Sequence, residues 1–188
     1  AYEMCGRDWS SDVCFPISHS EAPSPFSAVL SGVLIKMGIY GFLLTMYVVI
    51  GLRGFLSLGW RALPVHTILA IIGAVTIIVA TFIALAQNDA KRLLAWSTVA
   101  QAGYIFLGIS FGTAVGVAGG MLHFLSHAVF KALLFMAAGA VEYRTGGVRD
   151  LDSLGGLIKK MPVTFAEIGR AHFRTPHPTA HRVGRLML

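Results

Sequence analysis

The sequence predicts an all-α, multi-pass membrane protein, and two observations lead to that prediction. Of the 188 residues, 55% are hydrophobic and 13% are charged, whereas a soluble domain carries roughly a quarter charged residues. Four apolar segments also approach or exceed the length of about 20 residues that a helix needs to cross the hydrocarbon core. These segments cover residues 26–50, 65–86, 93–111 and 114–141.

Each apolar segment is expected to be an α-helix rather than a strand of a membrane barrel. Backbone N–H and C=O groups in lipid must find partners within the protein, and a helix pairs them within its own segment. Barrel strands alternate apolar and polar residues, and these four segments do not.

The first two segments differ in the charge that they carry. Segment 26–50 holds one charged residue, Lys36, whereas segment 65–86 has none and carries only His66 at its mouth. A lysine near the middle of a span costs roughly 2.5–3.5 kcal/mol on insertion scales. Lys36 is too central to reach either membrane surface easily, so its side chain should face protein or water.

Tyr40 follows Lys36 at helical spacing, and we expect both side chains to lie on one inward face. Desolvation disfavours the charged form of a buried lysine, and a lysine brought toward neutrality can load and release a proton. We therefore interpret Lys36 as a proton-relay residue with Tyr40 as a supporting polar group. The alternative is a structural lysine paired with a carboxylate elsewhere.

The fourth segment contains the stretch "HFLSHAVFKALLF", in which His123, His127 and Lys131 follow one another at intervals of four residues. Residues at this spacing lie on one face of a helix. Histidine titrates near a pH of about 6.5, so it can accept and donate protons at cellular pH. Three ionisable groups in register indicate a polar track, although an interhelical hydrogen bond is the alternative role for a membrane histidine.

The third segment carries a weaker polar stripe formed by Ser97 and Gln101. These side chains either hydrate the same track or form hydrogen bonds across helices, and we favour the second interpretation.

The histidines do not predict a metal or haem site. Two histidines four residues apart can share zinc, but no Glu, Cys or Asp lies nearby to complete the ligand shell. Haem between helices needs an axial ligand from an opposing helix, and His66 is the only other histidine near a span. We expect no metal, no cofactor and no catalytic site on this chain.

The connections between the segments are short: "GLRGFLSLGWRALP", "QNDAKR" and "GT". Short links make consecutive helices antiparallel neighbours. Gly112, Gly116 and Gly120 recur every four residues, a spacing that lets a neighbouring helix approach closely.

The loop charges predict the orientation in the membrane. One side holds residues 87–92 and 144–160 and carries more basic residues than the other, which has Arg53 and Arg61. The richer side has Lys91, Arg92, Arg144, Arg149, Lys159 and Lys160. The positive-inside rule assigns the richer side to the cytoplasm, so we expect a multi-pass protein of the inner (cytoplasmic) cell membrane, embedded in the lipid bilayer.

The net charge of +6 does not favour nucleic-acid binding. The basic residues cluster beside the apolar segments and in the C-terminal tail, where they usually report orientation instead. We expect no nucleic-acid partner.

Both ends differ from the middle of the chain, and we expect residues 1–17 and 167–188 to be non-native extensions. "DWSSDVCFPI" resembles the reverse-strand translation of a short-read sequencing adapter, and "EIGRAH" resembles the forward-strand translation of the same adapter. The natural part is then residues 18–166, a partial transmembrane domain that ends in a cytoplasmic loop. A genuine polar N-terminus and a His-rich tail are the alternative.

Three stretches in order resemble the antiporter-like, proton-translocating subunits of respiratory complex I. They are "HSEAPSPFSAVLSGVLIKMGIYGFL", "AQNDAKRLLAWSTVAQAGYIFLGI" and "HFLSHAVFKALLFMAAGAV". The same module occurs in Mrp-type Na⁺/H⁺ antiporters and in membrane-bound, energy-converting hydrogenases. The resemblance implies a subunit of about fourteen transmembrane helices with inverted repeats, of which the four here resemble the eighth to the eleventh.

The resemblance also implies roles for single residues. Lys36 matches the family's central lysine, and His127 matches the histidine on the same hydrated axis. His123 and Lys131 match the pattern of some branches. The charged residues that the family carries on its fifth, seventh and twelfth helices are absent, so we expect this stretch alone to lack a complete proton path.

We therefore expect a fragment of a membrane subunit that translocates protons, or exchanges H⁺ for Na⁺, through a buried lysine and histidine axis. The resemblance implies coupling to a redox complex such as NADH:quinone oxidoreductase, with other membrane subunits as partners. The alternative is a structural helical membrane subunit with no ion path of its own.

Overall fold

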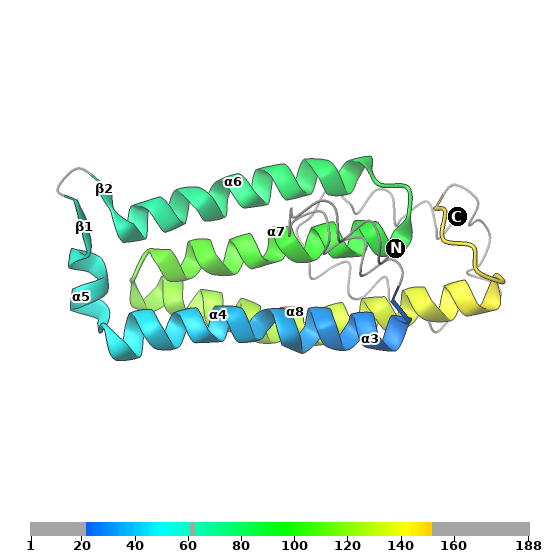
Figure 1. The fold of residues 1–188 in the computed structure, drawn as a ribbon, viewed down its shortest axis with the longest axis horizontal. Helices are drawn as coiled ribbons and strands as arrows, with labels where there is room; N and C mark the ends of the chain where they lie inside the picture. Colours follow the sequence, from blue (N-terminus) through cyan, green and yellow to red (C-terminus); the bar gives the residue numbers. More distant parts are fainter. Residues whose placement is uncertain (1–21, 61–62, 152–188) are drawn as a thin grey trace, which may run out of the picture.

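The computed structural model describes residues 22–60 and 63–151, which form four long helices side by side (Figure 1). Within this described part, four helices are long and apolar enough to cross a membrane: Ser24–Val49, Val65–Ala86, Ala90–Ser110 and Ala114–Arg144. The predicted all-α membrane fold is confirmed. The predictions for residues 1–17 and 167–188 lie outside the described residues, as do those for Arg61, Lys159 and Lys160.

The first spanning helix is built from four consecutive pieces, and we call them together the first helix. The pieces are α3 (Ser24–Val29), the π-helical η1 (Leu30–Leu34), α4 (Ile35–Leu43) and the π-helical η2 (Leu44–Val49). Short π-helical turns inside α-helices are rare and frequently occur at functional sites.

The connection after the first helix has structure that the sequence did not predict. It contains the short helix α5 (Leu52–Ser57) and two paired antiparallel strands, β1 (Gly59–Trp60) and β2 (Leu63–Pro64). Gly51 opens it with a φ of +80°, a backbone conformation that favours glycine. We call this side of the bundle the hairpin end (Figure 1).

The remaining spans are α6 (Val65–Ala86), α7 (Ala90–Ser110) and α8 (Ala114–Arg144). Helix α7 begins three residues before the predicted start because Asp89 caps it. The Asp89 carboxylate accepts hydrogen bonds from the backbone N–H of Lys91 at 2.8 Å and of Arg92 at 3.1 Å, which satisfies donors that a helix start leaves unpaired.

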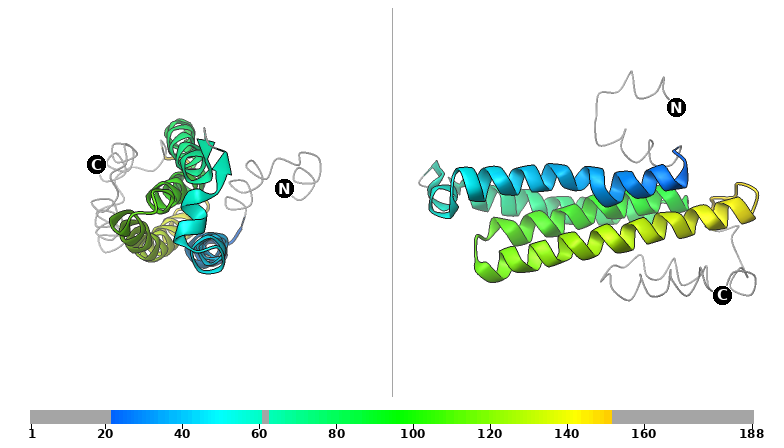
Figure 2. Two further views of the ribbon diagram at one scale, coloured as in Figure 1. Left: turned by 90° about the vertical axis from the view of Figure 1, so that its left-hand side faces the viewer. Right: turned by 90° about the horizontal axis from the view of Figure 1, so that it is seen from below.

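The helices are ordered α6, α7, α8 and then the first helix, as the end-on view shows (Figure 2). The consecutive pairs α6–α7 and α7–α8 are antiparallel neighbours. The first helix packs against α8, and the connection through α5 and the hairpin spans the distance to α6. We call the side where the first helix and α7 begin and α8 ends the basic end.

Glycines bring α7 and α8 close together, as the glycine spacing predicted. A Cβ added at Gly116 would lie 2.7 Å from the Gly108 carbonyl oxygen, and one at Gly120 would lie 3.0 Å from the Ile109 side chain. Gly112 forms the turn between the helices with a φ of +62°. The contact between these two helices therefore depends on the absence of side chains.

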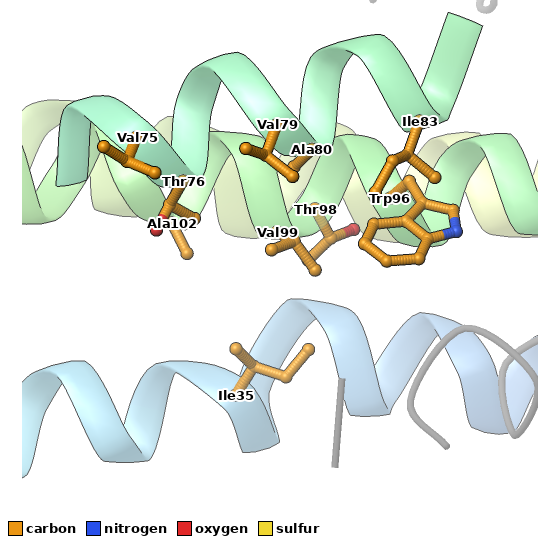
Figure 3. A pocket seen from close by; sticks show the side chains of 10 residues that line it. All are labelled: Ile35, Val75, Thr76, Val79, Ala80, Ile83, Trp96, Thr98, Val99 and Ala102. Carbon is orange, nitrogen blue, oxygen red and sulfur yellow. The ribbon is translucent and has the colours of Figure 1, made fainter. Parts of the chain in front are cut away.

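A cavity of about 650 Å³ opens between α4, α6 and α7 (Figure 3). Aliphatic side chains such as Ile35, Val79 and Val99 line most of it, together with Trp96 and two threonines. This lining offers few polar groups, so the ionisable residues that could carry chemistry must be sought elsewhere in the bundle.

We predict that replacing Gly116 with valine destabilises the α7–α8 contact, because the new side chain would enter the space of the Gly108 carbonyl. Overpacking of this kind costs about 1–3 kcal/mol, which thermal unfolding of the purified protein in detergent can measure. Gly119→Val is the matched control, since a Cβ there meets nothing within 4 Å. Equal unfolding temperatures for the two variants would contradict the close approach.

Candidate functional site

Ionisable side chains lie inside the bundle rather than on its lipid-facing surface. Lys36 is 4% exposed, and His127 and Lys131 are each 2% exposed. His123 is half-buried on the same helix as His127 and Lys131. We call these four residues the polar axis. They come from two neighbouring helices, the first helix and α8.

Lys36 is held against the backbone of its own helix. Its Nζ donates a hydrogen bond to the Ser31 carbonyl oxygen at 2.5 Å, at the point where η1 gives way to α4. A Cβ added at Gly32 would lie 3.4 Å from the Ala128 carbonyl oxygen, so the first helix and α8 approach closely beside Lys36. This approach turns the ammonium toward protein and away from lipid.

Lys131 is bonded across helices to Ser97. The Lys131 Nζ donates to Ser97 Oγ at 2.5 Å, and Ser97 Oγ donates to the Leu94 carbonyl oxygen at 2.9 Å. Ser97 therefore links the Lys131 ammonium to the backbone of α7 through two consecutive hydrogen bonds. The contact joins α7 to α8 at a residue of the proposed polar track.

His123 and Gln101 form a second bond between α7 and α8. The His123 Nε2 and Gln101 Oε1 atoms lie 2.6 Å apart, and Gln101 is 2% exposed. The His123 ring stacks toward His127, with ring centroids 6.1 Å apart and an interplanar angle of 24°. His123 and His127 thus place polar groups next to each other on successive turns of α8.

His127 is buried, yet neither of its ring nitrogens has a hydrogen-bond partner within the described part of the chain. Buried polar side-chain atoms are nearly always paired, with protein or with ordered water. His127 therefore keeps both an acceptor and a donor position for a group beyond the described residues, such as water.

The polar axis contains no carboxylate from the described residues. Across residues 22–60 and 63–151 the acidic side chains are Asp89, Glu142 and Asp150, and all three lie at the basic end. Lys36, His127 and Lys131 carry like charges when they are protonated, and like charges disfavour one another. The alternative of a structural lysine paired with an acid thus finds no described partner.

The structure does not bring Tyr40 into the polar axis, which corrects the expectation that it shares the buried face of Lys36. Tyr40 is 47% exposed, whereas Ile39 is 3% exposed. The inward positions of α4 are Lys36 and Ile39, so Tyr40 falls at the border of that face. Tyr47 lies further along, half-buried, and donates to the Ile109 carbonyl oxygen.

Sequence reasoning placed Lys91 and Arg149 on the basic side but missed their ion pairs with Glu142, and we call these three residues the charge cluster. Lys91 Nζ lies 2.8 Å from one Glu142 oxygen, and Arg149 Nε lies 2.5 Å from the other. Lys91 Nζ also donates to the Ala22 carbonyl oxygen at 3.2 Å. The Lys91 side chain is 4% exposed and that of Glu142 is 19% exposed, so this ion pair is largely buried.

One signal in the sequence could have found the charge cluster. Lys91 opens α7 and Glu142 closes α8, so an antiparallel pair of these helices brings the two residues to the same end.

Two backbone hydrogen bonds hold the chain around the charge cluster. The Ala90 N–H donates to the Arg149 carbonyl oxygen at 3.1 Å, and the Leu151 N–H donates to the Asn88 carbonyl oxygen at 2.9 Å.

No group of three or more His, Cys, Asp or Glu side chains that could hold a metal ion occurs among the residues that the structure describes. The polar axis combines imidazole and ammonium groups with hydroxyl and amide partners. Such groups can hold and exchange protons.

Comparison with known proteins places the chain in a family of membrane proteins. Residues 10–174 match the family model described as NADH:quinone oxidoreductase/Mrp antiporter, TM. Hydrogenase-4 component B of Escherichia coli K12 is 40% identical over 162 residues, which are 80% of this chain and 23% of the relative. NAD(P)H-quinone oxidoreductase chain 4 1 of Synechococcus sp. JA-2-3B'a(2-13) is 42% identical over 155 residues, 80% of this chain and 27% of the relative.

A solved structure agrees with these relatives. One chain of the membrane-bound sulfane sulfur reductase, an archaeal respiratory membrane complex, matches with a TM-score of 0.75 and 39% identity, covering 86% of this chain and 27% of that one. The chain therefore spans between 23% and 27% of the length of these three proteins.

We predict that Glu142→Gln destabilises the protein by about 3 kcal/mol, because it leaves the buried Lys91 ammonium unpaired. Adding Lys91→Met should recover much of that loss, since the unpaired charge is then removed. Chemical unfolding of the two single variants and the double variant measures the coupling. Arg144→Gln, which changes an exposed side chain of the same helix, is the control. Strictly additive effects would show that the ion pair contributes nothing.

Proposed function

The chain belongs to the NADH:quinone oxidoreductase/Mrp antiporter transmembrane family, and on that basis we propose that it is part of a membrane subunit that translocates protons. The path runs through the polar axis, and exchange of H⁺ for Na⁺ along it is the closest variant of the same function. The chain is a multi-pass membrane protein, and we propose the inner (cytoplasmic) membrane as its location, with the basic end toward the cytoplasm.

One observation carries the proposal: ammonium and imidazole groups gather inside a membrane bundle without a described acid to neutralise them. An ionised group buried without an opposite charge is costly, and ionisable residues inside membranes mark ion pathways and proton relays. Each basic group can lower that cost by releasing its proton. Charge on one group also opposes charge on the next through electrostatic repulsion. This arrangement favours transfer of a proton from group to group.

The geometry suggests a role for each residue. Lys36 acts as the central carrier that alternates between charged and neutral, beside the close contact of the first helix with α8. His127 accepts and donates a proton through its two unpartnered ring nitrogens, by way of water. His123 and Lys131 extend the track by one turn in each direction, and Gln101 and Ser97 hold them in place.

The relatives suggest the setting in which these protons move. Their names describe a hydrogenase component and a quinone oxidoreductase chain, and the solved structure is a respiratory membrane complex. We propose that the subunit assembles with other membrane subunits of such a complex. We propose that redox chemistry in that complex belongs to partner subunits and that the polar axis contributes proton carriers.

A second candidate function is purely structural, and a specific observation favours it. The Lys131–Ser97 and His123–Gln101 contacts join α7 to α8, as the polar contacts that fasten membrane helices do. In that case the buried groups hold the helices together and transport nothing.

We predict that Lys36→Met in the full-length protein slows proton transport by about a hundredfold while the complex still assembles. Methionine keeps most of the lysine's volume but cannot carry a proton. Proton uptake into inverted membrane vesicles measures transport, and native electrophoresis measures assembly.

Thr45→Ala is the matched control on the same helix, because the Thr45 side chain is exposed and its hydroxyl donates to the Gly41 carbonyl oxygen of its own helix. It should leave both readouts unchanged. Normal transport by Lys36→Met would refute the proton-carrier role, and a loss of assembly would favour the structural alternative.

A further inference from the structure

Phe135 lies between two groups of polar residues on one face of α8. It follows Lys131 by four residues, and Glu142 follows Lys131 by eleven, which is close to three whole turns of an α-helix. The face therefore presents a lysine of the polar axis, then a phenyl ring, then the carboxylate of the charge cluster. Phe135 is 0% exposed and is one of the largest fully buried side chains in the described part of the chain.

Helix α7 shows the same order along its length: a polar partner of the axis, then apolar residues, then a residue of the charge cluster. It runs antiparallel to α8, and its Ser97 bonds to Lys131 while its Lys91 pairs with Glu142. The buried residues between these two partners are apolar, namely Leu93 at 4% exposure and Ala95 at 0%. They lie at the level of Phe135.

The first helix supplies the third side of this layer. Gly32 packs against Ala128 and Ala132 of α8, so residues one turn nearer the basic end lie at the level of Phe135. Ala28 is there, 6% exposed, next to the buried Ser27. Apart from the hydroxyl of Ser27, the side chains named at this level are apolar.

We propose that Phe135 is a hydrophobic gate that separates the polar axis from the water at the basic end. Apolar constrictions in membrane proteins exclude water and reopen when they hydrate. The use of this gate rests on the proposed function: a proton that enters from the basic end reaches Lys131 only when the phenyl ring moves and water fills the layer.

The surroundings of Phe135 explain why the ring, rather than the backbone, is the moving part. Glu142 holds Lys91 and Arg149 together, and Lys91 also holds the start of the first helix through the Ala22 carbonyl oxygen. These contacts tie three segments of the chain at the basic end. Ion pairs thus hold the basic end together, whereas the ring of Phe135 is the largest buried side chain named in the layer below it.

The gate can be tested by an experiment that does not measure proton transport. A cysteine placed at position 97 by Ser97→Cys lies on the inner side of the proposed gate, and its reaction with a water-soluble, membrane-impermeant thiol reagent reports whether water reaches it. The full-length protein, with its other reactive cysteines removed, is labelled in lipid nanodiscs, where the reagent reaches both faces.

We expect the cysteine to react slowly when Phe135 is present and about tenfold faster after Phe135→Ala, because the deleted ring leaves a space that water can enter. Phe135→Val should give an intermediate rate and covers the case in which the alanine variant does not fold. Phe124→Ala removes a ring elsewhere on α8, within the apolar cluster around Ile105 and Ile109, and should leave the rate unchanged.

Equal labelling rates with and without the Phe135 ring, whether fast or slow, would overturn the gate. Passive proton entry into proteoliposomes is measured as well, because it tests the proposed proton path separately from the gate. Faster labelling without faster proton entry would retain the gate and refute the proton path. Unchanged labelling together with loss of transport in Lys36→Met would retain the proton path and refute the gate.

Discussion

The cost of holding uncompensated positive charge inside a membrane governs the rest of this structure. Taking an ammonium ion out of water costs several kcal/mol even after the protein relaxes around it. No described carboxylate offsets that cost along the polar axis, so the bundle supplies neutral oxygen atoms instead: the Ser31 carbonyl for Lys36 and the Ser97 hydroxyl for Lys131. The first of these contacts lies within one helix, and the second joins α8 to α7.

Much of the fold could be predicted from the sequence because a bilayer allows few solutions. Length and hydropathy define a spanning helix, and the four spans and their α-helical character follow from those two quantities. The burial of Lys36 and His127 was also predictable, since a charge at the middle of a span must avoid lipid. The glycine spacing likewise indicated that a neighbouring helix approaches closely, and that helix is α7.

Features that depend on register and on neighbours were less predictable. Spacing placed Tyr40 on the face of Lys36, but the width of the buried face depends on which helices flank it, and Tyr40 lies at its border. The π-helical turns of the first helix have no signature in hydropathy. Ser97 and Lys131 belong to different helices, so predicting their contact requires the register of α7 against α8, which the sequence does not give. The ion pairs of the charge cluster were missed for the same reason.

We propose that the side chains of the polar axis face a shared hydrated interior in which protons pass between them. Solid-state NMR of the full-length protein in lipid bilayers, with ¹⁵N-labelled lysine and histidine, tests it most directly by transfer of magnetisation from water. His127→Gln and Lys36→Met identify the two signals. We expect transfer from water to the His127 ring nitrogens and to the Lys36 amine. Transfer from lipid acyl chains alone, with none from water, would contradict it.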